Sequence, residues 1–566
     1  MEDFKSEYEK LSEERKELQE KGELPEWYTT GGFQLLKNKY LDEGESPRER
    51  YETVANEAAK YTADPDHWAQ RFFEVMWKGW LSPATPVLSN LGTTKGMPVS
   101  CSGNYVGDCV YDFYTSQTET AVLTQNGFGT SSYLGDIRYR GAPIKAGGKA
   151  SGVLPVLKDY VQLSRDITQG NNRRGAWAGY YPIDGKDFYE IADYLFHFPD
   201  DMNIGWIWSK EFYDKLNAGD QDALKRFQRM MKVRAVTGKG YVFKQWTVDE
   251  GRPQMYKDLG LDVKASNLCT EILLHSGDDY TFTCVLSSMN LYFWEEWKDT
   301  DAVEVGIRFL DAVAEAFIQQ AKGVKGLEKA VAFTEKGRAL GLGVLGFHSY
   351  LQSQMIPFES FQAHLVNGQI FKHIQEHSLK ASQELAQELG EPEWCKGYGV
   401  RNTHRTAVAP TMSTSLLVGG LSQGIEPVVM NVYNQSTAGG EVSRINPILL
   451  DIMKERGVYC EKTLEDLRDN KGSVQHVNWL NEEEKAVFKT AFEIDQAAIL
   501  RLASIRQKHL CQTQSLNLFF DAEEDEQYIA QIMKEFIDDE NLPTLYYQRG
   551  MAGIQASKGE CTACHA

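Results

Sequence analysis

The opening of the chain has the periodicity of an amphipathic helix. Large apolar residues recur there at helical intervals, at Phe4, Tyr8, Leu11 and Leu18. Gly22 and Pro25 follow, and because such residues commonly end a helix, the first helix is predicted to stop there. More helix is predicted through about Lys78. From Leu81 onward, short apolar runs alternate with Gly, Pro and Ser, which predicts many short strands and functional loops.

The last part of the chain has the clearest pattern. It predicts a long helix, a strand, a second helix and a second strand, over Asn481 to Leu510, Ser515 to Phe520, Glu523 to Ile537 and Thr544 to Gln548. A strand, a crossover helix and another strand form the repeating unit of a parallel sheet. After Arg549 large apolar residues are few and no period is visible, so a flexible tail is expected.

Composition narrows the possible functions. The 566-residue chain is 42% apolar and 11% aromatic, which is enough for a large buried core. Its 60 basic residues stand against 80 acidic ones, a net charge of -20. We therefore expect no binding along a nucleic-acid backbone, because that requires a concentrated basic surface. A small anionic ligand in a local pocket remains compatible with this charge.

The chain shows no signal for secretion or membrane insertion. The N-terminal stretch MEDFKSEYEK is acidic and lacks the apolar core of a secretion signal. The longest uncharged run, Thr406 to Ile425, is rich in Thr, Ser and Gly and contains Pro410, so it is a poor membrane span. A cytoplasmic protein is expected. The nine cysteines do not resemble a secreted disulfide framework, and some of these thiols are candidates for redox chemistry.

The stretch SNLCTEI, Ser266 to Ile272, carries an amide, a thiol and a carboxyl at every second position. In an extended strand or a finger loop, Asn267, Cys269 and Glu271 would point to one side and the intervening residues to the other. A thiol between a hydrogen-bonding amide and a potential base is a plausible reactive site. The alternative is an amphipathic surface strand without chemistry.

Two glycine-rich or cysteine-rich motifs each have competing interpretations. Gly341, Gly343 and Gly346 form GLGVLG, a literal dinucleotide fingerprint, but charged EKGRA precedes it where the motif needs a buried strand. Close packing of a glycine-rich strand is the alternative. The terminal CTACH, Cys561 to His565, has the spacing of a haem attachment site or a zinc half-site. A third interpretation is a dithiol on a flexible arm that exchanges with another disulfide.

Three further stretches also have two interpretations each. APTMSTS, Ala409 to Ser415, forms a phosphate cradle if a helix begins near Ser413, or an ordinary helix cap. TQGNNRRGAWAG, Thr168 to Gly179, is a solvated flexible loop or an anion-contacting one. LYYQ, Leu545 to Gln548, carries two tyrosines at adjacent positions of the last strand, which predicts one core and one surface aromatic residue.

Together these motifs resemble the large, catalytic subunit of class I ribonucleotide reductase, from about Trp27 to Cys564. The elements appear in the family's order: SPATPVLS, VSCSGNYVGD, NGFGTSSYLGDIRYRGAPI, NNRRGAWA, NLCTEI, TCVLSSMNL, APTMSTS, GIEP, LYYQ and the C-terminal cysteine pair. The resemblance implies a ten-stranded α/β barrel of two five-stranded parallel halves with a central finger loop. It divides the chain into a helical region (1–78), the reductase barrel (79–548) and a flexible redox tail (549–566).

The resemblance assigns chemical roles to five residues. Cys269 matches the cysteine that becomes a thiyl radical and abstracts the 3' hydrogen of the substrate ribose. Glu271 matches the base that acts on the 3' hydroxyl, and Asn267 a residue that hydrogen-bonds the substrate. Cys101 and Cys284 match the pair that delivers two electrons, assists loss of the 2' hydroxyl as water and ends as a disulfide. That bond requires their Cα atoms to lie within about 7 Å.

Other positions match the family's substrate site. Thr85, Ser100 and the backbone of Gly129 correspond to substrate-contacting positions. The diphosphate cradle corresponds to Thr411, Met412, Ser413, Thr414 and Ser415. The family varies at Met412, so only the backbone can serve there.

The resemblance also implies partners. Tyr546 and Tyr547 match the stacked pair that relays a radical from a separate small subunit, which carries iron or manganese; no cofactor and no metal are expected on this chain. Cys561 and Cys564 match the arm that reduces the spent disulfide and is itself reduced by thioredoxin or glutaredoxin. The relay pair separates class I from the cobalamin-dependent and glycyl-radical classes.

The last set of matched positions concerns regulation. The specificity-effector site for dNTP or ATP corresponds to Asp108, Arg138, Ile144 and Lys145, and the NNRRGAWA loop to the element that links effector to substrate choice. In the family this site lies at a dimer interface, which implies a homodimer. The reductase core begins almost at Met1, so an N-terminal ATP-cone domain is not expected, and neither is inhibition by dATP through one.

Two other function classes stay open at this point. A nucleotide-binding regulatory protein would keep the fold without the chemistry, although the five cysteines and the tyrosine pair are all present. An NAD-dependent oxidoreductase that uses GLGVLG would show nicotinamide-dependent activity without a small subunit.

Overall fold

The computed structural model describes residues 7–169, 173–437 and 440–550. The N-terminal region is helical, with α1 (Glu7–Glu20), α2 (Thr30–Lys39), α3 (Pro47–Ala59) and α4 (Pro65–Trp77). α1 ends just before Gly22, as its periodicity predicts. α3 opens with a capping box, in which Ser46 and Glu49 each accept a hydrogen bond from the other's backbone amide. These bonds satisfy amides that have no partner within the helix.

Five parallel strands form one half of the central sheet. They are β2 (Cys101–Tyr105), β3 (Gly129–Tyr133), β6 (Trp177–Pro182), β7 (Asn203–Trp208) and β8 (Tyr241–Lys244). Their order in the sheet follows the chain, and every neighbouring pair is parallel. Parallel neighbours need crossover connections. These contain α6 (Val110–Gln125), α7 (Val153–Asp166), α8 (Phe188–His197), α9 (Lys210–Asn217) and α10 (Gln221–Thr237).

The second half is also parallel. Its strands include β9 (Phe282–Asn290), β10 (Leu340–Leu345), β13 (Leu518–Phe520) and β15 (Gln548–Gly550). β9 pairs with β10, and β13 pairs with β15. Between these two pairs, Leu342 bridges to Thr406. Val408 in turn bridges to Gln514, a few residues before β13. The half therefore has five parallel segments, of which the one around residues 406–408 is reduced to isolated bridges.

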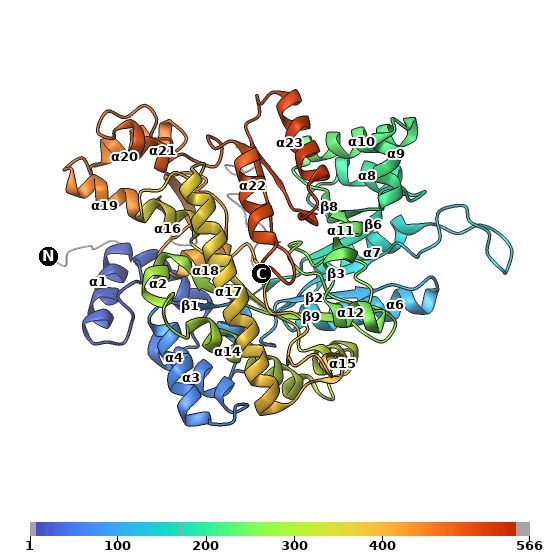
Figure 1. Cartoon of the computed structure of the whole chain (residues 1–566), viewed down its shortest axis with the longest axis horizontal. Helices are drawn as coiled ribbons and strands as arrows, with labels where there is room; N and C mark the ends of the chain where they lie inside the picture. The colour runs from blue at the N-terminus through green and yellow to red at the C-terminus, as the bar shows by residue number, and fades with distance from the viewer. Residues whose placement is uncertain (1–6, 170–172, 438–439, 551–566) are drawn as a thin grey trace.

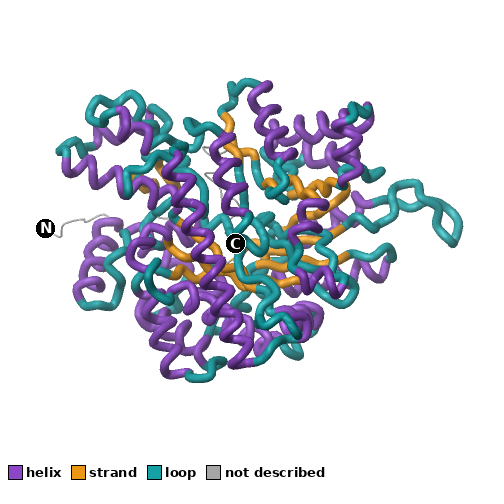
Figure 2. Tube along the Cα trace, in the orientation of Figure 1, coloured by secondary structure: helices purple, strands orange, loops and turns teal. Residues whose placement is uncertain are grey.

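Antiparallel pairing joins the two halves at both edges. β2 pairs with β9, and β8 pairs with β14 (Thr544–Leu545), which leads directly into β15. Joining both edges closes the sheet and leaves no open edge between the halves. Figures 1 and 2 show the strands at the centre of the molecule with helices around them. The predicted ten-stranded α/β barrel of two parallel halves is confirmed.

Further helices surround the second half. They are α14 (Ala302–Ala321), α15 (Glu328–Gly337), α16 (Phe347–Ser353), α17 (Phe361–Leu389), α18 (Met412–Leu417), α22 (Gln496–Gln507) and α23 (Glu526–Asp538). The smaller helices are α5 (Thr85–Asn90), α11 (Gln245–Gly251), α12 (Gln254–Leu259), α13 (Trp294–Trp297), α19 (Pro447–Glu455), α20 (Glu461–Asp469) and α21 (Glu482–Val487), with 3-10 turns at Leu291–Phe293 and Glu393–Cys395. No helix among the described residues is long and apolar enough to cross a membrane.

The remaining strands lie outside the barrel halves. They are β1 (Leu81–Pro83), which pairs with β9, the hairpin of β4 (Thr168–Gln169) and β5 (Arg173–Arg174), and the hairpin of β11 (Val432–Thr437) and β12 (Gly440–Ile445). The tip of the first hairpin and residues 551–566 of the predicted tail lie outside the described residues.

The single long helix predicted over Asn481 to Leu510 is wrong. The structure has α21 and α22, separated by an irregular stretch. Within that stretch Phe488 is fully buried, and the backbone amide of Ala491 donates to the Val428 carbonyl at 2.8 Å. Asp495 then caps the first turn of α22. The second cap and the contact to a distant segment outweigh the helical periodicity. Of the elements predicted after it, the strand and the helix are present as β13 and α23, whereas the last strand, Thr544 to Gln548, is divided between β14 and β15.

The GLGVLG motif is a closely packed strand. Gly341 and Gly343 lie within β10, and a Cβ atom on Gly341 would meet Leu286 Cδ2 at 2.4 Å. A Cβ atom on Gly343 would meet the Ala407 carbonyl oxygen at 2.4 Å. A dinucleotide fingerprint needs these glycines in the turn after a strand. The packing interpretation is confirmed, and the dinucleotide interpretation is wrong.

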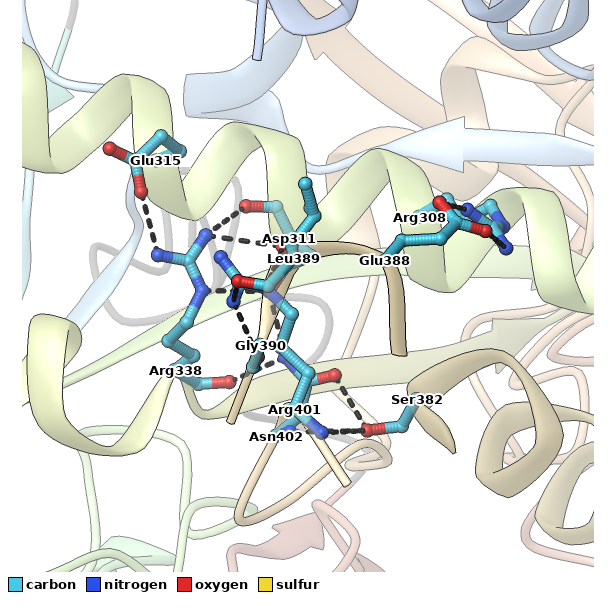
Figure 3. Close-up of polar contacts among 10 residues, drawn as sticks. All are labelled: Arg308, Asp311, Glu315, Arg338, Ser382, Glu388, Leu389, Gly390, Arg401 and Asn402. Atoms are coloured by element: carbon cyan, nitrogen blue, oxygen red, sulfur yellow. Dashed lines mark hydrogen bonds and ion pairs between the residues drawn. The ribbon is translucent and has the colours of Figure 1, made fainter. Parts of the chain in front are cut away.

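A buried ion-pair network lies among the helices of the second half (Figure 3). Asp311 on α14 accepts hydrogen bonds from Arg338 Nε, Arg401 Nε and Asn402 Nδ2, each at 2.9 Å. Arg338 also donates to Glu315 at 2.7 Å. Burial alone would raise the pKa of Asp311, but the guanidinium groups of Arg338 and Arg401 lower it to about 2. The network ties α14 to the end of α15 and to the segment that precedes residues 406–408.

We expect Asp311→Asn to lower the free energy of unfolding by about 3–5 kcal/mol, because the buried Arg338 and the largely buried Arg401 both lose the Asp311 carboxylate. Urea denaturation at neutral pH measures this change. The matched control is Asp214→Asn, which breaks the exposed pair with Lys210 and should cost at most about 1 kcal/mol. Equal losses in the two variants would contradict the network's role.

Candidate active site

Two of the predicted redox cysteines face each other across the seam between the halves. Cys101 on β2 lies directly opposite Cys284 on β9. Residues opposite each other in an antiparallel pair have Cα atoms about 4.5–5.5 Å apart, within the reach of a disulfide. Both thiols are free in this structure and buried. The register therefore meets the distance requirement for bonding between them.

The SNLCTEI stretch is a buried loop inside the barrel and not a strand. Thr270 has a positive φ of 68°, which breaks the alternation expected of an extended chain. All three polar side chains are fully buried: Asn267, Cys269 and Glu271. The surface-strand interpretation is therefore wrong, and of the two predicted conformations only the finger loop remains.

Side chains from around the barrel hold this loop. Its backbone carbonyls accept hydrogen bonds from Ser131 on β3, Tyr180 on β6 and Thr544 on β14. The backbone amide of Thr513 donates to the Glu271 carbonyl at 3.1 Å. Contacts from both halves of the barrel thus fix the loop at its centre.

The loop meets the cysteine pair directly. Asn267 Nδ2 donates to Cys101 Sγ at 3.3 Å, and the Cys101 thiol lies 4.0 Å from Glu271 Oε1. Cys269 belongs to the same buried apolar cluster as Cys101 and Cys284. Three cysteines distant in sequence, an amide and a carboxyl therefore converge within one enclosed site.

Burial sets the protonation of this site. It raises the pKa of Glu271 to about 7, although hydrogen bonds with Asn267 and Ser515 partly offset the effect. Burial and the nearby Glu271 carboxyl raise the pKa of Cys101 well above its usual range. The pKa of Cys284 is also raised by burial, and Gln512 partly offsets this shift. Near neutral pH both paired thiols are protonated, whereas Glu271 is poised to accept a proton.

The predicted last strand is interrupted at its two tyrosines. β14 ends before Tyr546 and β15 begins after Tyr547, and both rings are buried with centroids 4.1 Å apart. The prediction of one core and one surface aromatic residue is wrong. Instead of pairing within a strand, the Tyr547 amide donates to the Asn517 side chain at 2.9 Å. Tyr241 on β8 extends the group, because its hydroxyl donates to the Tyr547 hydroxyl at 3.2 Å.

The predicted substrate-contacting residues lie at two places. The Gly129 amide donates to the Ser100 carbonyl at 2.7 Å, so both residues adjoin Cys101. The Ser100 hydroxyl is buried and has no hydrogen-bond partner among the described residues. Thr85 begins α5, and its hydroxyl shares a 2.9 Å hydrogen bond with Tyr40.

The APTMSTS stretch forms the start of a short helix, as predicted to within one residue. α18 begins at Met412, after Thr411 with a positive φ of 56°. The Thr411 hydroxyl accepts a hydrogen bond from the Gly424 amide at 2.8 Å. Ser413, Thr414 and Ser415 are buried, whereas Met412 is half-buried. The Ser415 amide makes an intrahelical bond, to the Thr411 carbonyl.

The predicted effector residues lie on loops beside β2 and β3. Arg138 donates to the Asp108 carboxylate from its backbone amide and its Nε, at 2.9 and 2.8 Å. Ile144 is half-buried and Lys145 is exposed, both in a turn closed by the Gly147 amide and the Ile144 carbonyl. Within the NNRRGAWA loop, Arg173 and Arg174 form β5 and pair with β4, whereas Asn171 and Asn172 lie outside the described residues. Cys561 and Cys564 lie outside the described residues, so their assignment stays a prediction.

Sequence reasoning gave no role to several residues that touch the site. Gln512, Ser515 and Asn517 contact Cys284, Glu271 and Tyr547 respectively, and Tyr241 contacts the tyrosine pair. The available signal was the run of polar residues in TQSLN, just where a buried strand is predicted. Polar residues need hydrogen-bond partners when they are buried, and the partners of these residues include groups of the site.

Comparisons with known proteins agree with this geometry. The family model of the ribonucleotide reductase barrel domain matches residues 99–225, 194–396 and 392–547, and the model of the all-alpha domain matches residues 26–96. The ribonucleoside-diphosphate reductase large subunit of Invertebrate iridescent virus 3 is 31% identical, over 93% of this chain and 94% of that protein. The solved class Id ribonucleotide reductase alpha subunit of Actinobacillus ureae is 38% identical, with a TM-score of 0.86 over 93% of this chain and 98% of that one.

Family models cover most of the chain, and a relative above 30% identity spans nearly all of it. The structural match extends the agreement to the arrangement of the barrel. The chain therefore belongs to the ribonucleotide reductase family, as a large, catalytic subunit of class I, which implies a small-subunit partner.

Proposed function

We propose that this chain reduces ribonucleoside diphosphates to 2'-deoxyribonucleoside diphosphates by a radical mechanism, for DNA precursor synthesis. The observation that carries the proposal is the meeting of the buried SNLCTEI loop with the paired thiols: Asn267 contacts Cys101 at 3.3 Å, and Cys101 lies opposite Cys284. A regulatory nucleotide-binding protein would have no need of three converging buried cysteines.

In the proposed first step, a thiyl radical on Cys269 removes the hydrogen atom from C3' of the ribose. The S–H bond forms as the C3'–H bond breaks, and Glu271 accepts the proton of the 3' hydroxyl. The pKa of Glu271, raised to about 7 by burial, suits a group that must take up and return a proton. Full burial of Cys269 supports this assignment, because a radical must be kept from water.

In the proposed second step, the 2' hydroxyl leaves as water. Cys101 and Cys284 together supply two electrons and two protons and become a disulfide, and Cys269 returns a hydrogen atom to C3'. The raised pKa values of Cys101 and Cys284 support this second step, since thiols that stay protonated can donate protons to the leaving hydroxyl. Ser100 and Gly129, which adjoin Cys101, are proposed to contact the substrate, together with Thr85. The start of α18 is proposed to hold its diphosphate.

The radical is proposed to arrive from the small subunit through Tyr547 and Tyr546. Their buried rings, in contact at a centroid distance of 4.1 Å, support a relay toward the finger loop. The small subunit would hold the metal, iron or manganese. Cys561 and Cys564 are proposed to reduce the spent disulfide, before thioredoxin or glutaredoxin reduces them in turn.

Specificity effectors, dNTP or ATP, are proposed to bind at Asp108, Arg138, Ile144 and Lys145, with the β4–β5 hairpin passing the signal to the substrate. A homodimer is proposed at the same place. Three apolar side chains on α6, just after Asp108, support it because they are strongly exposed: Val110 at 68%, Tyr111 at 77% and Tyr114 at 59%. Exposed apolar groups of this kind commonly mark a protein interface.

The test is reconstitution of the chain with candidate small subunits loaded with iron or manganese. CDP reduction is then measured with each dNTP effector and with thioredoxin or glutaredoxin as reductant. Formation of dCDP that needs both subunits supports the proposal. Nicotinamide-dependent activity without a small subunit, or nucleotide binding without reduction under every condition, would overturn it.

The pKa of Glu271 predicts the pH dependence of this reaction. Because the base must be ionised, kcat/KM should rise about tenfold per pH unit below pH 7 and level off above it. The matched control is Glu426→Gln, since burial also raises the pKa of the Glu426 carboxyl to about 7. The acid limb of the pH profile, in which kcat/KM rises with pH, should persist in that variant. Its disappearance there would assign the titration to Glu426 instead.

A further inference from the structure

The segment Gln512–Asn517 has the sequence QTQSLN, is here called the TQSLN segment after its last five residues, and runs through the site from the paired thiols to the tyrosines. Backbone hydrogen bonds fix it against the neighbouring barrel segment: Gln512 donates to Thr406, Val408 to Thr513 and Ser515 to Val408, at 2.9–3.1 Å. All six of its residues are buried. A segment held in this way offers its side chains in set positions.

At one end, Gln512 joins the paired thiols to the finger loop. Its Nε2 lies 3.6 Å from Cys284 Sγ and donates to the Leu340 carbonyl at 3.0 Å. Its Oε1 accepts a hydrogen bond from the Leu273 amide, also at 3.0 Å. One amide group therefore contacts a redox thiol, the strand beside it and the end of the catalytic loop.

In the middle, Ser515 contacts the catalytic loop at two points. Its hydroxyl lies 2.6 Å from the Cys269 carbonyl and 3.2 Å from Glu271 Oε2. The neighbouring Thr513 amide holds the Glu271 carbonyl. The side chain and the backbone of Glu271 are thus both oriented from this segment.

At the other end, Asn517 holds the tyrosine pair. Its side-chain oxygen accepts the Tyr547 amide at 2.9 Å, at the break between β14 and β15. Its Nδ2 donates to the buried carboxyl of Glu426. Because the amide is bonded on both sides, its orientation is set, and so is the position of the Tyr547 backbone.

We propose that Gln512, Ser515 and Asn517 are positioning residues that serve three different steps of one reaction. Gln512 serves re-reduction of the Cys101–Cys284 disulfide, Ser515 serves proton transfer at Glu271, and Asn517 serves the radical relay at Tyr547. The inference rests on the proposed function. It predicts that variants at three positions of one short segment fail in three separable ways.

The role of Gln512 follows from the chemistry of disulfide exchange. A thiolate of an external dithiol attacks one sulfur of the Cys101–Cys284 bond, and the other sulfur leaves as a thiolate and takes a proton. The second thiol of the reductant then closes its own disulfide, which completes the two-electron transfer. An N–H group directed at Cys284 stabilises that sulfur as the leaving thiolate, and a better leaving group departs faster.

The first experiment oxidises the full-length chain and follows reduction of the Cys101–Cys284 disulfide by dithiothreitol, with alkylation and mass spectrometry of the two peptides. Gln512→Met should slow reduction about threefold to tenfold, as expected for loss of one hydrogen bond. The matched control is Gln507→Met, because Gln507 touches the same segment from α22 but none of the reacting groups. In this control variant the Cys101–Cys284 disulfide should be reduced at the wild-type rate.

This assay needs no small subunit, so it separates the inference from the proposed function. A wild-type rate in Gln512→Met, or equal slowing in both variants, overturns the role of Gln512. A wild-type chain that cannot form the disulfide at all overturns the proposed function, and the inference with it.

The second experiment measures the pH profile of CDP reduction in Ser515→Ala and Ser515→Thr. Loss of a hydrogen bond to the ionised carboxyl raises the pKa of Glu271, so the acid limb of Ser515→Ala should move to higher pH with KM unchanged. Threonine keeps a hydroxyl and should restore the limb. The other titratable groups facing Glu271 are Cys101 on β2, Cys284 on β9 and Tyr180 on β6, each with a raised pKa. An unmoved limb in Ser515→Ala overturns this role.

The third experiment places 3-aminotyrosine, an easily oxidised tyrosine analogue, at position 547 and measures its radical by electron paramagnetic resonance after mixing with the small subunit. Asn517→Leu should lower the radical yield at least about threefold while CDP binding and disulfide reduction stay unchanged. The matched control is Asn541→Leu, because the Asn541 side chain donates to Ser504 on α22 and not to the tyrosine pair. Equal yields in the two variants overturn the role of Asn517.

Discussion

Replacement of Cys269 by alanine is expected to lower turnover by a factor on the order of 10⁴ or more, to the level of the assay blank. The side chain lost is the proposed hydrogen-atom carrier, and no other group can take its place at the centre of the barrel. CDP binding should persist, because the side-chain hydroxyls of Ser131, Tyr180 and Thr544 hold the loop by its backbone carbonyls and do not involve the thiol. Turnover with a reconstituted small subunit and CDP binding by calorimetry measure the two effects.

The matched control for this variant is Cys395→Ala. Cys395 is also fully buried, but its thiol contacts Met255 and none of the reacting groups. The control should keep most of the wild-type turnover. Retained turnover in Cys269→Ala, or equal loss in both variants, would defeat the assignment of Cys269.

Replacement of Tyr547 by phenylalanine is expected to abolish turnover driven by the small subunit. The ring and its contact with Tyr546 remain, but the hydroxyl that must be oxidised and deprotonated is gone. Formation and reduction of the Cys101–Cys284 disulfide by external reagents should be unchanged, because neither reaction uses the relay. dCDP formation and the disulfide assay, run on the same preparation, separate the two activities.

Tyr241→Phe is the control for the relay. It removes the hydroxyl that donates to Tyr547 and leaves the tyrosine pair intact. Loss of one hydrogen bond should lower turnover by about tenfold at most. Full turnover in Tyr547→Phe would remove that residue from the relay. Complete loss in Tyr241→Phe would instead make Tyr241 a member of it.

Local patterns predicted the parts of the fold that local energetics decide. The opening helix ends at Glu20, just before Gly22, and the strand and helix β13 and α23 lie within their predicted bounds or close to them. In each case the apolar period and a nearby cap or breaker agree. The helix over Asn481 to Leu510 failed because a backbone bond to Val428 and a second cap at Asp495 compete with the period.

The site was predicted by its residue types, but not by its arrangement. Asn267, Cys269 and Glu271 were expected on an extended stretch, yet a positive φ at Thr270 turns that stretch into a loop. The tyrosine pair was expected to point to opposite sides, yet Asn517 accepts the amide bond that a regular strand would have formed. The loop depends on partners as distant as Thr544, and the break at the tyrosines on a partner 30 residues away, and no local pattern contains either contact.

The order and chemistry of the motifs were thus determined by the sequence alone: which cysteines, which carboxyl, which tyrosines and which class of barrel. Only the tertiary structure decided that Cys101 and Cys284 lie opposite each other and that the finger loop meets them. It also decided that the TQSLN segment contacts Cys284, Glu271 and Tyr547. The physical reason is that the type of a side chain is given by a single position in the sequence. The distances between these side chains depend on how the strands and loops pack, and their protonation depends on burial. Burial is a property of the closed barrel as a whole.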